Sequence, residues 1–267
     1  DATDSDLQNL FGSFFVVDEG QDFSPSFYQL LGEAWRRLKD KFCPTILADE
    51  NQILNEHTNS SINDIRSGLG LIAKMVSSFG EKELTINYRN TREIATLANF
   101  FYDDTASTPP IPPNIESRIL PKYLNFIDQD KAAQKIVNYS NKHPSKKIGV
   151  LLAPGTNAYL SKTMAESIRD NQGLNGELYH YWSDAKFKVA GVSRPNETSF
   201  QKQGTVTVLS RQSSKGLELD TVFVMHIESL EMDDRLPDTK RNLYVLCTRS
   251  REHLFLCSVG LEENSLP

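Results

Sequence analysis

The chain has 267 residues, of which 39% are hydrophobic and 24% charged, a composition typical of a globular protein with one large or two smaller domains. No stretch approaches the roughly 20 consecutive apolar residues that a transmembrane helix needs, which excludes a membrane span. The net charge of −6 argues against a nonspecific basic coat for nucleic acid, although a local groove needs only a few Lys or Arg side chains.

The three cysteines form no C-x-x-C pair, and the five histidines show no zinc-ligand spacing. This pattern is typical of a reducing compartment, so we expect a cytoplasmic protein without a structural metal. Cys247 and Cys257 lie in apolar stretches, which predicts that both are small core residues.

Short runs rich in β-branched and other apolar residues recur along the chain. They predict strands at residues 13–19, 45–50, 83–88, 147–153, 205–210, 221–227 and 253–259. Amphipathic stretches at residues 24–39 and 157–170 predict helices between them. Strands that are apolar throughout and alternate with helices form parallel sheets covered on both faces, so we expect the α/β fold class.

Both predicted helices carry local signals. Ser24 is a candidate N-cap, and Pro25 would occupy the first helical position, where its missing N–H is not needed. In the second helix Leu160, Met164 and Ile168 recur every four residues, which is the spacing of one helix face.

Carboxylates follow two of the predicted strands. Asp18 and Glu19 end the first strand, and Asp49 ends the second. Adjacent like charges repel, and burial increases the repulsion, so the site must open to solvent or hold a cation. Ligands bind at the carboxyl ends of strands in open α/β sheets, and Mg²⁺ binds one or two carboxylates together with substrate phosphates. The pattern therefore indicates magnesium that arrives with a nucleotide; the alternative is a solvated strand end followed by a helix cap.

Other polar stretches each have a simple interpretation when taken singly. Arg89 could form a surface salt bridge, Lys215-Gly216 could form a hairpin-like turn, and residues 248–252 could be a solvated helix end. Their order along the chain is more informative than any one of them.

In that order, the stretches resemble the motifs of the UvrD/Rep/PcrA group of superfamily 1 helicases. VVDEGQD (16–22) and ADENQ (48–52) resemble motifs II and III. NYRNTREIATLAN (87–99), SSKGLELDTVFV (213–224) and RNLYVLCTRS (241–250) resemble motifs IV, V and VI. The resemblance covers nearly the whole chain and implies RecA-like parallel sheets flanked by helices, the P-loop NTPase helicase fold.

The resemblance implies a role for each matching residue. For catalysis it implies that Asp18 holds Mg²⁺, Glu19 activates the hydrolytic water and Gln52 senses the γ-phosphate. Arg89 and Arg249 would contact the transferring phosphoryl group. For cofactor binding it implies that Tyr88 stacks on the adenine, Glu218 accepts from the ribose and Arg241 contributes to binding. For nucleic-acid binding the implied residues are His57, Ser214 and Lys215. Arginines suit such a site because phosphoryl transfer depends mainly on positioning and charge neutralisation.

The resemblance also changes the expected domain boundary. By composition, the proline-rich stretch 107–114 indicates an extended linker. The family pattern instead places the second RecA-like domain just before motif IV. We therefore expect residues 1–82 to be the C-terminal remnant of a first RecA-like domain and residues 83–267 to be a complete second domain without a large inserted accessory domain.

Three features depart from the family pattern. No G-x-x-x-x-G-K-[ST] P-loop occurs, and the resemblance would place it upstream of Asp1, so we expect the chain alone to be inactive. In motif III, Asn55 cannot stack on a base as an aromatic side chain would, whereas His57 can. In motif V, Gln212 stands where the family usually has His.

We expect the C-terminal part of an ATP-dependent DNA helicase or translocase that uses ATP and Mg²⁺ on single-stranded or partially duplex DNA. Its expected partner is a P-loop domain upstream in the same protein. The alternative is a non-catalytic helicase-like scaffold that binds DNA or a partner protein, although a scaffold has no reason to retain Glu19, Arg89 and Arg249. In motif VI we expect Arg251 to point away from the site, because residues two apart on a helix do not share a face.

Overall fold

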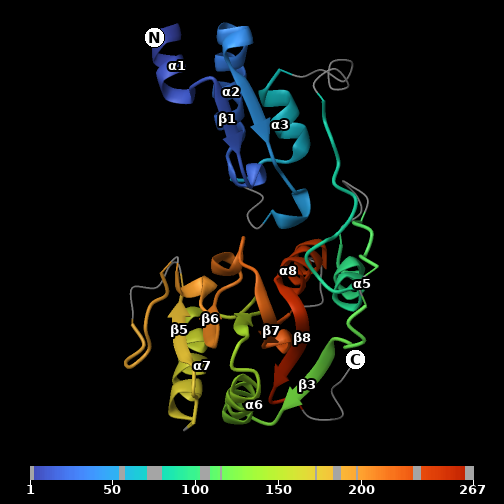
Figure 1. The fold of residues 1–267 in the computed structure, drawn as a ribbon, viewed down its shortest axis with the longest axis vertical. Coiled ribbons are helices and arrows are strands. Elements are labelled where there is room, and N and C mark those ends of the chain that lie inside the picture. Colours follow the sequence, from blue (N-terminus) through green and yellow to red (C-terminus); the bar gives the residue numbers. More distant parts are fainter. Residues whose placement is uncertain are drawn as a thin grey trace. The chain divides into compact units, whose positions relative to one another are not determined.

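The chain divides into two compact units, Asp1–Leu84 (unit 1) and Thr85–Pro267 (unit 2) (Figure 1). The computed structural model describes residues 3–53, 58–70, 80–102, 109–114, 116–171, 173–182, 188–196, 198–230 and 236–261. The division falls close to the boundary expected after residue 82, and the proline-rich stretch 107–114 belongs to unit 2. Among the described helices, none is long and apolar enough to cross a membrane.

Unit 1 is built on a short parallel sheet with helices packed against it. Its elements are α1 (Asp4–Phe11), β1 (Phe14–Val17), α2 (Pro25–Leu38), β2 (Cys43–Ile46) and α3 (Ile62–Gly68). β1 and β2 pair in parallel, with Phe14 opposite Cys43 and Val17 opposite Ile46. The two strands therefore end at the same edge of the sheet.

Helix α2 begins as the sequence predicted and forms the centre of unit 1. The Ser24 hydroxyl accepts a hydrogen bond from the Phe27 N–H at 3.4 Å, and Pro25 is the first helical residue. A Cβ atom added to Gly32 would lie 2.3 Å from the carbonyl oxygen of Gly68, so α2 and α3 touch backbone to backbone. Any larger residue at either glycine would separate the two helices.

One face of the unit 1 sheet is apolar and open in the described structure. The side chains of Phe14 and Val16 are 85% and 64% exposed, whereas Val17 is buried. Leu47, directly after β2, is also exposed. Apolar sheet faces of this kind are normally covered by another layer.

Unit 2 contains a six-stranded sheet in which all neighbouring strands are parallel, in the order β3-β8-β7-β4-β6-β5. The strands are β3 (Lys122–Phe126), β4 (Lys147–Leu152), β5 (Glu177–Tyr181), β6 (Thr205–Leu209), β7 (Leu219–Met225) and β8 (Ser250–Val259). The helices are α5 (Arg92–Phe100), α6 (Gln129–Lys142), α7 (Ala158–Asp170) and α8 (Leu236–Thr248).

Helices cover both faces of this sheet (Figure 1). One core contains Ile136 of α6, Met164 of α7 and the inward side chains Val150 and Leu152 of β4. The other core contains Leu151, which points to the opposite face, together with residues of α5 and α8. The alternation along β4 is that of a strand buried on both sides, and the expected α/β fold class is confirmed.

Cys247 and Cys257 are completely buried, so the prediction that both are core residues is confirmed. Burial raises the pKa of the Cys247 thiol to about 12. Burial likewise raises the pKa of Cys257, with a further contribution from the charge of Glu228. Neither thiol is reactive at neutral pH, because the thiolate is the nucleophilic form.

One predicted strand is wrong, and two strands were missed. Residues 83–88 form only a single bridge, Ile86 opposite Ile111, because the prolines that flank Ile111 lack the N–H groups a ladder needs. β3 and β5 escaped prediction because they are the edge strands of the sheet and carry polar residues. An edge strand needs no continuous apolar run.

Candidate functional site

The carboxylates of unit 1 lie together at the carboxyl edge of β1 and β2. We call Asp18, Glu19 and Asp49 the acidic edge. Gln21 links two of them, because its side-chain amide donates to Glu19 Oε2 at 2.5 Å and its Oε1 accepts from the Asp49 N–H at 2.9 Å. Gln21 is 0% exposed, so a buried neutral amide fixes the distance between the two strand ends.

Gln52 joins the same edge through Asp49. Its Nε2 donates to Asp49 Oδ2 at 2.9 Å, while Oδ1 of the same carboxylate accepts from the Asn51 N–H at 2.9 Å. The structure therefore brings Asp18, Glu19, Asp49 and Gln52 to one edge of the sheet. Both Asp49 oxygens accept protein hydrogen bonds, and its carboxylate caps the following turn.

A strained turn presents Glu19. Its backbone lies in the left-handed region at φ 50° and ψ 47°, which costs a non-glycine residue of the order of 1 kcal/mol. A Cβ atom on the next residue, Gly20, would lie 2.7 Å from Ile46 and 2.8 Å from the Tyr28 hydroxyl. That hydroxyl donates to the Gly20 carbonyl at 2.5 Å, and burial raises the Tyr28 pKa to about 12. The turn is thus held by the core beneath it.

Asp18 has the properties of a single magnesium ligand. Its side chain is exposed at the strand end, and one oxygen accepts from the Glu19 N–H at 2.9 Å. Within the described ranges, no cluster of three or more His, Cys, Asp or Glu side chains could hold a metal on its own. Mg²⁺ needs only one or two protein carboxylates when phosphates and water supply the other ligands, so the acidic edge fits that mode.

In unit 2, residues from three distant segments meet where β7 and β8 begin. Arg89 Nε donates to Glu218 Oε1 at 2.9 Å, and Arg251 Nη1 lies 4.0 Å from Glu218 Oε2. We call Arg89, Glu218 and Arg251 the arginine cluster. The side-chain amide of Asn90 donates to the carbonyls of Thr248 and Ser250 at 3.0 and 2.5 Å. These bonds hold the segment that carries Arg89 against the start of β8.

Arg249 is placed differently from the other arginines. It is 0% exposed, its Nε donates to the Val245 carbonyl at 3.0 Å, and its Nη2 donates to the Thr248 hydroxyl at 3.2 Å. Helix α8 ends at Thr248, so Arg249 is the residue that joins α8 to β8 and is not itself helical. The Arg249 carbonyl accepts from the N–H of Leu219 at 3.0 Å, and Leu219 is the residue that follows Glu218.

Arg251 does not point away from the other candidates, and that expectation is wrong. The argument assumed a helix through residues 249–251, but Arg251 belongs to β8. Arg249 precedes β8 and turns back onto the end of α8, whereas the side chain of Arg251, 49% exposed, reaches Glu218.

The remaining predicted residues of unit 2 lie around this region in varied settings. Tyr88 is 82% exposed, and Arg241 is a partly exposed residue of α8. Arg241 lies seven positions before Thr248, the last residue of α8, which is about 10 Å along the helix axis. Ser214 is 0% exposed and its hydroxyl donates to the Arg211 carbonyl at 2.7 Å, whereas Lys215 is partly exposed. His57 lies outside the described residues.

The connection that carries Lys215-Gly216 is not a hairpin. β6 and β7 both run parallel to β4, so residues 210–218 cross from the carboxyl end of one strand to the start of the other. Ser214 and Lys215 lie at and just after a short 3₁₀ turn of this crossover, and Glu218 lies at its end. The hairpin-like alternative is therefore excluded.

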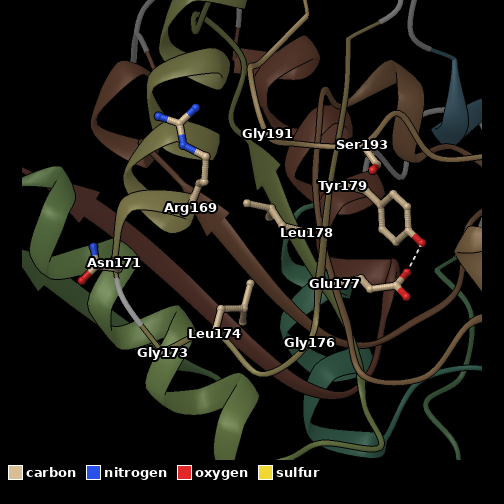
Figure 2. A pocket seen from close by; sticks show the side chains of 10 residues that line it. All are labelled: Arg169, Asn171, Gly173, Leu174, Gly176, Glu177, Leu178, Tyr179, Gly191 and Ser193. Carbon is tan, nitrogen blue, oxygen red and sulfur yellow. Dashed lines mark hydrogen bonds between the residues drawn. The ribbon is translucent and has the colours of Figure 1, made fainter.

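A separate cavity of about 340 Å³ lies beside the edge strand β5 (Figure 2). Arg169, Glu177 and Tyr179 line it, and the Tyr179 hydroxyl donates to the Glu177 carboxylate. The Arg169 guanidinium donates to Asp170 at 2.7 Å. No predicted site residue lines this cavity, so it is distinct from both charged clusters.

Comparisons with known proteins agree with the motifs. Residues 205–257 match the family model of the UvrD-like helicase C-terminal domain. The chain is 25% identical over 275 residues to "Putative ATP-dependent DNA helicase R568" of Acanthamoeba polyphaga mimivirus; the match covers 97% of the chain but spans only 36% of that relative. A solved structure of the C-terminal domain of a possible DNA helicase from Lactobacillus plantarum WCFS1 aligns with a TM-score of 0.41 and 14% identity, over 65% of this chain and 88% of that one.

The family match and the viral relative confirm the resemblance to UvrD-like DNA helicases. The matched segment, 205–257, contains the crossover with Lys215 and Glu218, the whole of α8, and both Arg249 and Arg251. Sequence reasoning missed Gln21 and Arg251. Gln21 follows the strand-end carboxylates Asp18 and Glu19, and Arg251 precedes the apolar run of β8 at residues 254–257.

Proposed function

We propose that the chain is the C-terminal part of an ATP-dependent DNA helicase or translocase that couples ATP hydrolysis to movement along DNA. The observation that carries the proposal is the ion pair between Arg89 and Glu218, residues 129 positions apart in the sequence. Two motifs matched only by sequence pattern thus meet in space, and one of them lies within the segment that matches the helicase family.

In this proposal the acidic edge binds the metal ion and activates the attacking water. Asp18 would hold Mg²⁺, which supplies charge neutralisation at the phosphates when bound. Glu19 would accept a proton from the attacking water, and the buried Gln21 would keep its carboxylate in place. Gln52, hydrogen-bonded to Asp49 of the same edge, would sense the γ-phosphate.

The cations of unit 2 would act on the phosphates of a bound nucleotide. Arg89 and Arg249 would neutralise charge that develops on the transferring phosphoryl group, as bidentate guanidinium donors do well. The exposed ring of Tyr88 would stack on the adenine, Glu218 would accept from the ribose, and Arg241 would contribute to nucleotide binding.

Single-stranded or partially duplex DNA is the proposed substrate. Lys215, partly exposed on the crossover, supplies the positive charge that phosphate contacts need. The buried Ser214 would help through its backbone, because its hydroxyl is engaged with Arg211. His57 is retained as a candidate base-stacking residue.

An upstream P-loop domain of the same protein is part of the proposal. The exposed apolar face formed by Phe14 and Val16 is the kind of surface that further strands and helices of a larger sheet would cover. Without a P-loop to cradle the phosphates, residues 1–267 alone would not hydrolyse ATP. We place the whole protein in the cytoplasm.

The test is DNA-stimulated ATP hydrolysis by the full-length protein. Glu19→Gln should reduce kcat by about 100-fold or more, because the general base is lost while the shape of the side chain is kept. Gln29→Ala, an exposed change on α2, is the matched control and should leave kcat unchanged.

Hydrolysis that survives Glu19→Gln at the wild-type rate would contradict the proposal. A full-length protein that binds DNA but shows no ATP hydrolysis would instead support the non-catalytic scaffold.

A further inference from the structure

Arg251 faces the charged candidates of unit 2. Its guanidinium lies 4.0 Å from Glu218 Oε2, and the other oxygen of the same carboxylate accepts from Arg89. Arg249, the arginine that the helicase motif singles out, is buried and bonded to the end of α8. The exposed arginine that shares Glu218 with Arg89 is therefore Arg251.

The backbone holds Arg251 in this position independently of the ion pair. The Thr91 N–H donates to the Arg251 carbonyl at 3.1 Å, so β8 begins directly beside the segment that carries Arg89. Asn90 strengthens the same junction through its bonds to Thr248 and Ser250. These bonds keep the two backbone segments adjacent, and Glu218 bridges their guanidinium groups.

The charges of the cluster favour an anion. Two guanidinium groups share one carboxylate, which leaves one positive charge uncompensated within the cluster. Glu218 and Arg251 are 43% and 49% exposed, and ion pairs that exposed change an equilibrium constant by about fivefold or less. Bidentate contacts of arginine with phosphate are stronger than this, so phosphate oxygens can displace Glu218.

We propose that Arg251 is a further phosphate-binding residue of the nucleotide site, and that Glu218 is a positioning residue that holds Arg89 and Arg251 together until phosphates replace it. The inference rests on the proposed function and adds a cation that the motif pattern does not assign. Glu218 then has two roles: it positions the arginines in the nucleotide-free protein, and it accepts from the ribose when a nucleotide is bound.

The experiment titrates inorganic tripolyphosphate, without metal ions, into the 267-residue chain and follows the arginine Nε–H signals by NMR. Signals of both Arg89 and Arg251 should shift together. Arg251→Ala should weaken the apparent affinity by about 10-fold, the value of one charge-assisted contact, and Arg251→Lys should restore part of it. Glu218→Gln should tighten binding by about fivefold or less, because the competing carboxylate is gone.

Arg169→Ala is the matched control, because Arg169 also pairs with an exposed carboxylate but lies on α7, beside the opposite edge of the sheet. It should leave the affinity unchanged. An Arg251→Ala protein that binds as the wild type does, an Arg251 signal that tripolyphosphate does not move, or a Glu218→Gln protein with weaker binding would each overturn the inference.

This outcome is separable from that of the proposed function. Binding of tripolyphosphate by the cluster requires no hydrolysis, so a full-length protein without ATPase activity would refute the proposed function and leave this inference standing. Active ATP hydrolysis together with an unchanged phosphate affinity of Arg251→Ala would support the proposed function and refute this inference.

Discussion

The acidic edge of unit 1 and the arginine cluster of unit 2 are held in opposite ways. In unit 1 a fully buried amide, Gln21, fixes Glu19 and Asp49 through neutral and charge-assisted hydrogen bonds. In unit 2 the half-exposed Arg89 and Arg251 are held by one half-exposed carboxylate. Buried hydrogen bonds are costly to break and exposed ion pairs contribute little. The comparison indicates a preorganised acidic side and a cationic side that can change partners.

The largest expected effect concerns the two arginines assigned to the phosphoryl group. In the full-length protein, Arg89→Ala or Arg249→Ala should lower kcat by about 10³-fold, the range for arginine fingers, with a smaller effect on nucleotide binding. Arg249→Ala should also destabilise the chain, by about 3 kcal/mol, because a buried, hydrogen-bonded side chain is removed.

Steady-state kinetics and thermal unfolding separate these two consequences. Arg169→Ala serves as the control, since it removes an arginine beside the opposite edge of the sheet. If Arg249→Ala kept its kcat while losing stability, Arg249 would be a structural residue and the motif VI assignment would be wrong.

The next effect tests how rigid the acidic edge is. Gly20→Ala should destabilise unit 1 by about 2–3 kcal/mol, because the new methyl group would collide with Ile46 and the Tyr28 hydroxyl. Gly216→Ala in unit 2 should cost only about 1 kcal/mol, since its backbone has φ +75° but nothing lies within 4 Å. Urea unfolding of the chain measures both, and equal costs would remove the contrast between the two units.

A smaller loss is expected when the bridging amide is removed. Gln21→Ala should destabilise unit 1 by about 2 kcal/mol, because it removes a buried side chain and leaves the partly buried Asp49 N–H without its acceptor. Gln29→Ala, the same change at an exposed position of α2, should alter stability by less than about 0.5 kcal/mol. Identical unfolding midpoints for the two variants would mean that Gln21 does not organise the edge.

The smallest effect is expected in the arginine cluster itself. Glu218→Gln should change the unfolding free energy of the chain by less than about 1 kcal/mol, because both of its partners are exposed to solvent. A loss comparable to that of Gln21→Ala would show that the cluster is as firmly built as the acidic edge.

The sequence predicted the acidic edge well because one rule connects pattern to place. Parallel strands end at one edge, so carboxylates that follow two neighbouring strands lie close together, as they do after β1 and β2. The same reasoning found the start of α2 from Ser24 and Pro25. The helix start depends only on adjacent residues, and the acidic edge depends on two successive strands of unit 1.

The arginine cluster was predicted less completely because its geometry depends on where α8 stops. A helix that continued past Thr248 would have turned Arg251 away, whereas a strand that starts at Ser250 directs it to Glu218. Nothing in the local sequence fixes that boundary, since Asn90, more than 150 residues earlier in the chain, supplies the amide that holds the junction.

The crossover between β6 and β7 has a mechanical consequence. Lys215 and Glu218 are three residues apart, a span of at most about 10 Å even in a fully extended chain. The backbone between them has little slack, since Glu218 is followed at once by the buried Leu219, whose N–H is anchored to Arg249. A displacement of Lys215 would therefore reach Glu218, and through its ion pairs Arg89 and Arg251, along a backbone segment of three residues.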